Sequence, residues 1–217
     1  MAHSSQSASA TRVREEISSA TPKSRTSAGS DSGRLWYSME YHAGGTLADP
    51  VRELSTAEKL KAVADAARGA HALHEAGIAH RDIRPANVLL GLDHAVLADL
   101  ELARFLTPGQ TVTSTAPVGD LEYTDPALVR GDRASRASDI WSLGLTLHRA
   151  LSDTTCYPGL TPEAGTLPAV RRILSGGPEI STRLDPAVAE LVRACVAPDP
   201  ADRPPTALVL AEEIEAL

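Results

Sequence analysis

The chain has 217 residues and a formal net charge of −7, with charged residues making up 23% of the sequence and hydrophobic residues 42%. This length is enough for one domain with a sizeable core. The negative charge argues against nucleic acid or an anionic membrane surface as a partner.

No apolar run approaches the roughly 20 residues of a membrane span, and the N-terminal residues lack the apolar core of a signal peptide. The two cysteines, Cys156 and Cys195, stand in apolar contexts without the spacing of a metal site. We interpret them as buried, reduced thiols and expect a cytoplasmic protein. Only three of the 21 basic residues are lysines, a bias typical of a GC-rich bacterial coding sequence.

Residues 1–33 are dominated by Ser, Thr, Ala and Gly and have almost no apolar periodicity. Such a segment cannot bury enough surface to offset the entropy of ordering it. We therefore predict a disordered tail over 1–33 and a folded domain over 34–217. Only Val13–Ile17 breaks the pattern, with room for a short piece of helix.

The domain begins with an aromatic, strand-like run, Leu35–Tyr41, followed by a glycine turn at Gly44-Gly45. Ser55 and Glu58 have the spacing of a capping box, which predicts the start of a long helix. Its buried stripe runs through Leu60, Val63, Ala67, Ala70 and Leu73, and Gly77 is a stop signal.

The segment after this helix places a carboxylate, a cation and a carboxamide within six residues, at Asp82, Arg84 and Asn87. Pro85 forbids a continuous helix and Val88–Leu90 is a short apolar run, so a strand braces a polar loop. Such a loop suits phosphoryl transfer. Asp82 could accept the proton of an attacking hydroxyl, Arg84 could neutralise the moving phosphate, and Asn87 could hold a metal ion.

A second short strand, Ala95–Ala98, ends at Asp99, whose carboxylate is a suitable ligand for a hard cation. Residues 105–118 are rich in hydroxyl groups, a composition that a plain flexible loop shares. The helix that begins at Ser138 is apolar on nearly every side, which is typical of the centre of a helical domain. Two amphipathic helices, around 187–196 and 205–217, close the chain.

In order and spacing, these motifs resemble the large, C-terminal lobe of a bacterial, Hanks-type serine/threonine protein kinase. The loop from His80 to Asn87 is similar to the kinase catalytic loop H-R-D-L-x-x-x-N, and Asp99 stands where kinases carry Asp-Phe-Gly. Asp139, in Asp-x-Trp-Ser-x-Gly, and Arg203, in Asp-Arg-Pro, follow in the family's order. The resemblance implies an α+β fold that is mostly α, with short strands at the hinge and the catalytic loop.

The resemblance also implies roles for individual residues. The catalytic residues would be Asp82, Arg84 and Asn87, and the Mg²⁺ ligands Asn87 and Asp99. At the hinge, Met39 would be the gatekeeper, and Glu40 and His42 would bind adenine through main-chain groups. Leu89 would be a further ATP-binding residue. In the activation segment, a phosphorylated hydroxyl would pair with Arg81, the candidates being Thr111, Thr113, Ser114 and Thr115. His80, Asp139 and Arg203 would be structural.

Several positions depart from the family's pattern. Glu101 replaces the Gly of Asp-Phe-Gly and adds a charge near the phosphates. Arg84 and Asp120 replace a Lys and a Thr, which predicts a charge-assisted pair that holds the end of the activation segment against the catalytic loop. Ala127 replaces the glutamate that usually pairs with Arg203, so we expect that buried ion pair to be lost or rerouted.

The small, N-terminal β lobe of a kinase has no counterpart before Leu35, where the sequence has no Gly-x-Gly-x-x-Gly loop and no Val-Ala-Ile-Lys strand. We therefore expect weak binding of ATP and Mg²⁺, and a protein substrate or partner that covers the surface facing the missing lobe. Three interpretations stay open: a protein kinase whose small lobe is supplied elsewhere, a pseudokinase that scaffolds or regulates a partner, and an N-terminally truncated kinase gene product.

Overall fold

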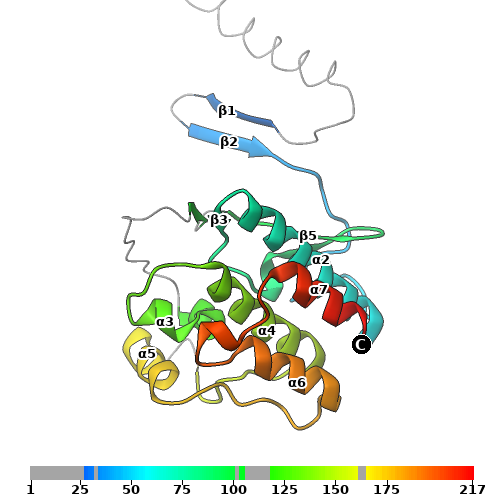
Figure 1. The fold of residues 1–217 in the computed structure, drawn as a ribbon. Coiled ribbons are helices and arrows are strands. Elements are labelled where there is room, and N and C mark those ends of the chain that lie inside the picture. The colour runs from blue at the N-terminus through cyan, green and yellow to red at the C-terminus, as the bar shows by residue number, and fades with distance from the viewer. Residues whose placement is uncertain (1–26, 32–33, 101–102, 106–117, 161–164) are drawn as a thin grey trace, which may run out of the picture. The chain divides into compact units, whose positions relative to one another are not determined.

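The computed structural model describes residues 27–31, 34–100, 103–105, 118–160 and 165–217, and Figure 1 shows its helices and strands. The contacts divide the chain into two compact units, residues 1–41 and residues 42–217. This division lies after the boundary that the sequence predicts between residues 33 and 34.

The described part of the first unit is an antiparallel hairpin of β1 (Ser27–Asp31) and β2 (Arg34–Ser38). The predicted tail extends to residue 33, and this prediction does not hold for β1. The prediction considered only the burial of side chains, whereas strands are paired by backbone hydrogen bonds that Ser and Gly make equally well. Residues 1–26, with the short helix predicted near residue 15, lie outside the described residues.

The first helix of the second unit, α2 (Thr56–Glu75), forms as the sequence predicts. The Ser55 hydroxyl accepts the N–H of Glu58 and the Glu58 carboxylate accepts the N–H of Ser55, so the capping box is complete. The pKa of Glu58 falls to about 2, first because Arg52 donates to its carboxylate and then because Ser55 does. After the helix, Gly77 has a φ of 74°, a left-handed conformation that ends helices and that glycine adopts at little cost.

Short strands follow α2 and frame the polar loop. Strand β4 (Val88–Leu90) pairs with β5 (Ala95–Leu97), and β3 (Ile78–Ala79) pairs with β6 (Arg104–Phe105), each antiparallel. The segment 44–47 lies along β4, because the N–H groups of Gly44 and Leu47 donate to the carbonyls of Leu90 (3.0 Å) and Val88 (2.9 Å). An added Cβ at Gly44 would lie 2.5 Å from the Leu90 oxygen, so only glycine allows this approach.

The central helix, α4 (Arg136–Ser152), is buried along most of its length, as its apolar sequence predicts. The shorter elements around it are η1 (Pro85–Asn87), η2 (Val118–Tyr123), α3 (Pro126–Val129), α5 (Thr166–Ser175), α6 (Pro186–Cys195), η4 (Pro200–Asp202) and α7 (Ala207–Glu215). The two predicted C-terminal helices are thus present as α6 and α7.

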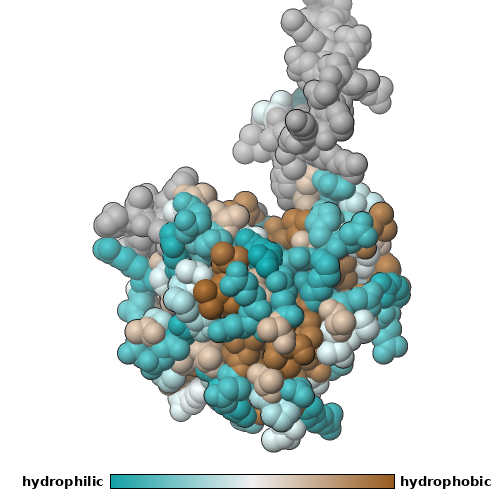
Figure 2. Space-filling view, turned by 45° about the vertical axis from the view of Figure 1, so that its right-hand side comes forward, coloured by the Kyte–Doolittle hydropathy of each residue, from teal (hydrophilic) through white to brown (hydrophobic). Residues whose placement is uncertain are grey.

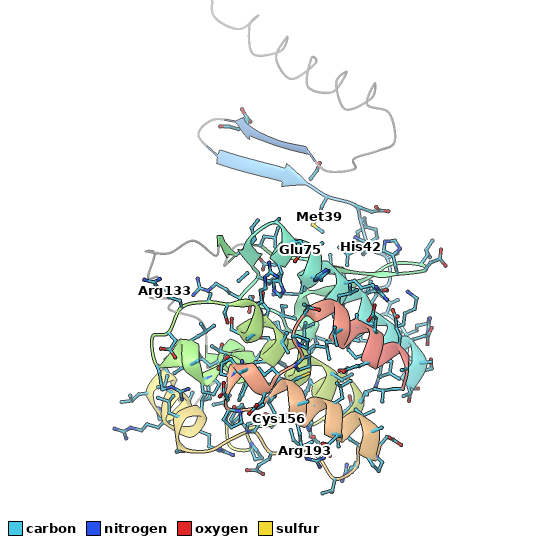
Figure 3. All side chains as sticks on the ribbon, in the orientation of Figure 1. Met39, His42, Glu75, Arg133, Cys156 and Arg193 are labelled. Atoms are coloured by element: carbon cyan, nitrogen blue, oxygen red, sulfur yellow. The ribbon has the colours of Figure 1, made fainter. Side chains whose placement is uncertain are left out.

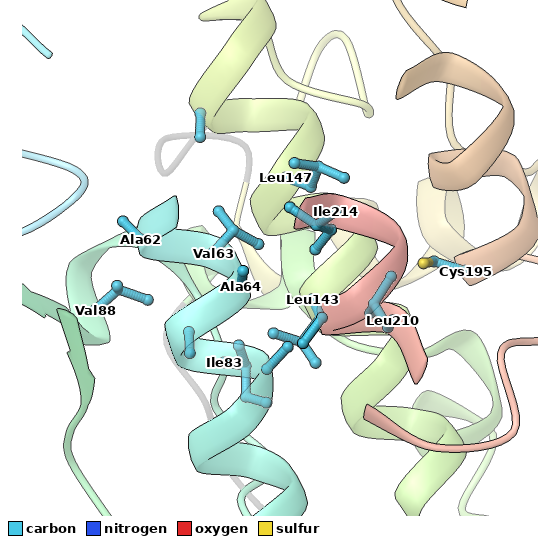
Figure 4. Close-up of a cluster of buried hydrophobic side chains, with 14 of the residues drawn as sticks. Ala62, Val63, Ala64, Ile83, Val88, Leu143, Leu147, Cys195, Leu210 and Ile214 are labelled. Atoms are coloured by element: carbon cyan, nitrogen blue, oxygen red, sulfur yellow. The ribbon is translucent and has the colours of Figure 1, made fainter. Parts of the chain in front are cut away.

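Two clusters of buried apolar side chains form the core of the second unit. The larger cluster joins α2, α4, α6 and α7, and Figure 4 shows part of it, including Val63, Leu143 and Leu210. The smaller cluster gathers Trp141, Leu145 and Tyr157 with residues of α5. Both cysteines are buried and free, as predicted, and burial raises the pKa of the Cys156 thiol to about 12.

In the part of the chain that the structure describes, no helix is both long and apolar enough to cross a membrane. On the face drawn in Figure 2, hydrophobic areas alternate with hydrophilic side chains. The most exposed large apolar side chains are Leu92, Tyr41 and Val51.

Candidate functional site

One buried carboxylate on α4 holds the polar loop between β3 and η1. Asp139, fully buried, accepts the backbone N–H of His80 at 2.8 Å and that of Arg81 at 2.9 Å. Its Oδ2 also lies 2.8 Å from Nε2 of His74 on α2. Arg81 has a φ of 72°, a conformation that costs a residue with a side chain about 1–3 kcal/mol. The contacts of Asp139 offset this strain and fix the course of the loop.

His80 turns its ring inward and links the loop to the end of β5. Its Nε2 lies 3.0 Å from the Ala98 carbonyl oxygen, and its Nδ1 accepts the N–H of Asp82 at 3.3 Å. Burial lowers the pKa of His80, although the charge of Asp139 opposes the shift. A neutral ring protonated on Nε2 satisfies both contacts, so His80 serves as a fixed brace in this position.

Asp82, Arg84 and Asn87 come together around one carboxylate oxygen. Nδ2 of Asn87 donates to Oδ2 of Asp82 and to the Asp82 carbonyl oxygen, both at 2.8 Å. Nε of Arg84 lies 3.4 Å from the same Oδ2. Since Nδ2 of Asn87 donates to Asp82, the side-chain oxygen Oδ1 is the acceptor atom of the same carboxamide. The carboxylate of Asp82 is thereby held in one orientation.

The β4–β5 hairpin brings Asn87 and Asp99 to the same end. Val88 is paired with Leu97, and the N–H of Ala98 donates to the Asn87 carbonyl oxygen at 2.8 Å. Asp99 follows directly, exposed and with a φ of 67°. A carboxylate and a carboxamide oxygen suit Mg²⁺, which needs few protein ligands beside water and phosphate. The described residues contain no group of three or more His, Cys, Asp or Glu that could hold a metal.

The four residues predicted to bind adenine are divided between the two units. Met39, labelled in Figure 3, and Glu40 belong to the first unit. Met39 is 41% exposed. His42 and Leu89 belong to the second unit, where both are half-buried. Leu89 forms a β-bridge with Thr46, so the chain leaving the hinge runs along β4.

Most of the predicted activation segment lies outside the residues that the structure describes. Thr111, Thr113, Ser114 and Thr115 fall within residues 106–117, which the structure does not describe, and the side chain of Asp120 is likewise outside it. The described chain resumes at η2. The carbonyl oxygen of Tyr123, at its end, accepts the Ser142 hydroxyl of α4 at 2.8 Å.

Arg203 has a different partner from the one the family pattern supplies. Its Nη1 lies 2.5 Å from Oδ2 of Asp125, and both side chains are almost fully buried. The ion pair expected to be lost or rerouted is therefore rerouted, to a carboxylate two positions before Ala127. Sequence reasoning missed Asp125, although an acidic residue directly before Pro126 was a visible signal.

His74 and Ser142 are two further contributors that the sequence analysis did not single out. Each is a polar residue on the buried side of a helix, where an unpaired polar group is costly. A polar residue among the apolar positions of a helix was therefore the sequence signal that could have identified both residues. Each side chain contacts a group of the candidate site or of the segment beside it.

Comparison with known proteins places these motifs in one family. The model of the protein kinase domain matches residues 16–214. The serine/threonine-protein kinase PknB of Mycobacterium leprae is 36% identical over 129 residues, which cover 57% of this chain and 21% of that protein. The serine/threonine-protein kinase PknL of Mycobacterium tuberculosis is 30% identical over 196 residues, which cover 87% of this chain and 48% of that protein. The chain thus spans about a fifth of PknB and about half of PknL.

Proposed function

Because the chain belongs to the protein kinase family, we propose that it is built to transfer the γ-phosphoryl group of ATP to serine or threonine hydroxyls of proteins. The observation that carries this proposal is the cluster of Asp82, Arg84 and Asn87 on a loop fixed by Asp139. Similarity to serine/threonine kinases such as PknB supports the choice of protein hydroxyls as acceptors.

Each residue of the cluster has a chemical task in this proposal. Asn87 and Arg84 engage Oδ2 of Asp82, so Oδ1 is the oxygen that takes the proton of the attacking hydroxyl. Arg84 neutralises charge on the moving phosphoryl group. Asn87, through its side-chain Oδ1, and Asp99 would hold Mg²⁺, which would neutralise charge on the phosphates. In this proposal Met39 is the gatekeeper, Glu40 and His42 offer main-chain groups to adenine, and Leu89 is a further ATP-binding residue.

The chain by itself should bind ATP weakly. Its sequence before His42 has no glycine-rich loop and no Val-Ala-Ile-Lys lysine, so fewer N–H groups and no such cation face the phosphates. We propose that another segment or another protein supplies this half of the clamp and covers the surface near Leu89. The alternative is a pseudokinase that uses the same surface to hold a partner without transferring phosphate.

Titration calorimetry with ATP and MgCl₂ tests the ATP proposal on the purified chain. We expect binding weaker than micromolar that loses its Mg²⁺-dependent part in Asp99→Asn and in Asn87→Ala. Asp93→Asn, in the exposed β4–β5 turn, is the control and should bind as the unchanged chain does. Tight binding that is independent of both substitutions would contradict the proposed metal site.

Radiolabelled phosphotransfer to casein distinguishes a kinase from a pseudokinase. A kinase should lose roughly 100-fold or more of its rate in Asp82→Asn, because the carboxylate that takes the proton is removed. A rate that is already at background in the unchanged chain, with a recombinant kinase small lobe added, would favour the pseudokinase.

We further propose that Arg84 pairs with Asp120 and so ties the end of the activation segment to the catalytic loop. The support is chemical: a guanidinium and a carboxylate replace a Lys and a Thr at two positions that the family brings together. In a double-mutant cycle of Arg84→Lys and Asp120→Thr, we expect a coupling of about 0.5–3 kcal/mol in the free energy of unfolding. Strictly additive changes would refute the pair.

A further inference from the structure

The structure assigns Asp125 as a positioning residue that, through Arg203, holds the segment 118–124 in place beside the catalytic loop. The segment in question leads into α3 and follows the hydroxyl-rich stretch of the chain. Asp125 uses both oxygens: Oδ1 accepts the N–H of Ala127 at 2.9 Å and caps α3, while Oδ2 contacts Nη1 of Arg203 at 2.5 Å. Asp125 is 2% exposed, so both contacts are made away from solvent.

Arg203 is itself fixed by three other groups. Its Nη1 donates to the Ala137 carbonyl oxygen at 2.8 Å, and its Nε donates to the Ala197 carbonyl oxygen at 2.9 Å. Its guanidinium lies over the ring of Trp141, 5.0 Å from the centroid. The guanidinium of Arg203 is therefore fixed between the start of α4 and the chain after α6, and Asp125 forms its ion pair with this fixed group.

The same helix also holds the catalytic loop. Within α4, Ala137 contacts Arg203, Asp139 accepts the N–H groups of the loop, and Ser142 donates to the Tyr123 carbonyl oxygen. These residues lie within two turns of one helix. Helix α4 thus positions both the loop that carries Asp82 and the segment 118–124. It holds the segment directly at Tyr123 and, through Arg203, at the adjoining Asp125.

The chain provides its own comparison for this assignment. The tripeptide Asp-Pro-Ala occurs at 125–127, 185–187 and 199–201, and in each case the Asp side chain accepts the N–H of the Ala at 2.9 Å. Asp185 and Asp199 are exposed, whereas Asp125 is buried against an arginine. Capping a helix is therefore common to all three, and the buried ion pair sets Asp125 apart from the other two.

Hydrogen exchange on the full chain tests the assignment without relying on catalysis. We compare Asp125→Asn with Asp185→Asn, since Asn keeps an oxygen for the cap and removes the charge. We expect amides of 121–128 to exchange roughly tenfold faster or more in Asp125→Asn, the effect of losing a charge-assisted hydrogen bond, with α2 amides unchanged. Unchanged exchange in 121–128, or an equal effect of Asp185→Asn there, would overturn the assignment.

A second variant covers the case in which Asp125→Asn does not fold because Arg203 is left buried without its charge partner. In that case the double variant Asp125→Asn/Arg203→Met, which removes both charges, is compared with Asp185→Asn instead. Faster exchange of the 121–128 amides supports the assignment, and unchanged exchange there overturns it.

The inference rests on the proposed kinase function only where it assigns the segment 118–124 a role in binding the protein substrate. In phosphotransfer to casein, we expect the variant to raise KM for casein severalfold and to leave KM for ATP unchanged. Equal effects on both constants would overturn the positioning role. Absence of phosphotransfer in the unchanged chain with the recombinant small lobe added would count against the proposed function, while the exchange comparison would still decide the role of Asp125.

Discussion

At the scale of single residues, the site depends on how many donors one buried carboxylate can satisfy. Asp139 has no exposure to solvent and contacts His74, His80 and Arg81 with its two oxygens. Two of the donors are backbone N–H groups of the loop that carries Asp82. The strained φ of Arg81 depends on these contacts, so a change in Asp139 acts on Asp82, which it does not touch.

Asp139→Asn should lower the free energy of unfolding by about 3 kcal/mol, because an amide NH₂ group would face a backbone N–H in the protein interior. Urea denaturation followed by circular dichroism measures this loss. Asp153→Asn is the matched control on the same helix, since Asp153 ends α4 with a φ of 54° and Asn accepts that conformation. A loss below about 1 kcal/mol in Asp139→Asn would show that the loop is held by other contacts.

At the scale of elements, the sequence predicts those helices and strands that carry a local signal. The capping box at Ser55 and the apolar run of α4 are such signals, and both elements form. Helix α5 carries an amphipathic signal that the sequence analysis did not use, because Ala169 and Ile173, four residues apart, both face inward. Two of its other apolar residues, Leu167 and Leu174, are exposed, so tertiary packing decides which apolar positions are buried.

The candidate site follows the same division between local and distant information. Asp82, Arg84 and Asn87 lie within one short stretch, so their proximity could be predicted from the sequence. The contact of Asp125 with Arg203 joins residues 78 positions apart. No local pattern determines it, and the family's pattern placed the carboxylate at position 127. The structure was needed to locate this partner.

Packing between α4 and α6 gives a prediction about one glycine. A Cβ added at Gly144 would lie 2.3 Å from Cβ of Cys195, closer than real contacts allow. Gly144→Ala should therefore lower the free energy of unfolding by about 1–3 kcal/mol, the usual cost of overpacking. Gly177→Ala, where nothing lies within 4 Å of the added atom, is the control. Equal thermal midpoints for the two variants would show that α6 moves aside at no cost.

The contact of α4 with the 181 region predicts a pH dependence through His148. This ring is fully buried, its Nε2 accepts the N–H of Ser181 at 2.9 Å, and burial lowers its pKa from the ordinary value of 6.5. The unfolded chain then binds more protons than the folded chain between the lowered pKa and 6.5. The contribution of neutral, buried His148 to the free energy of unfolding is therefore complete above pH 6.5 and is lost as the pH falls towards the lowered pKa.

Thermal midpoints measured from pH 8 down to pH 5 check this direction. His148→Gln keeps an oxygen that can accept the Ser181 N–H and does not titrate, so the midpoint should fall less steeply in this variant. Part of the slope should persist, because the pKa of His80 is also lowered by burial. His94→Gln, in the exposed β4–β5 turn, serves as control. A slope unchanged by His148→Gln would contradict the prediction.

At the scale of the whole molecule, the contacts described above that hold the loop carrying Asp82 lie within one unit. Both core clusters consist of residues after His42, and so do the contacts of Asp139 and Arg203. Among the side chains that the structure describes, the first buried apolar one along the chain is Leu47, which is 7% exposed. It lies in the segment that pairs with β4, the strand directly after Asn87. The segment 44–47 therefore supports the candidate site from the start of the second unit.

Two truncations separate this contribution from that of the first unit. A fragment of residues 42–217 should fold and unfold at the same urea midpoint as the full chain, since both core clusters lie within it. A fragment of residues 53–217 keeps the capping box but loses Leu47 and the hydrogen bonds that Gly44, Gly45 and Leu47 make with β4. It should be less stable by about 2–4 kcal/mol, because a core side chain and a set of strand hydrogen bonds are removed together. Equal stability of the two fragments would show that β4 needs no partner on this side, and a destabilised 42–217 fragment would place part of the folding energy in the first unit.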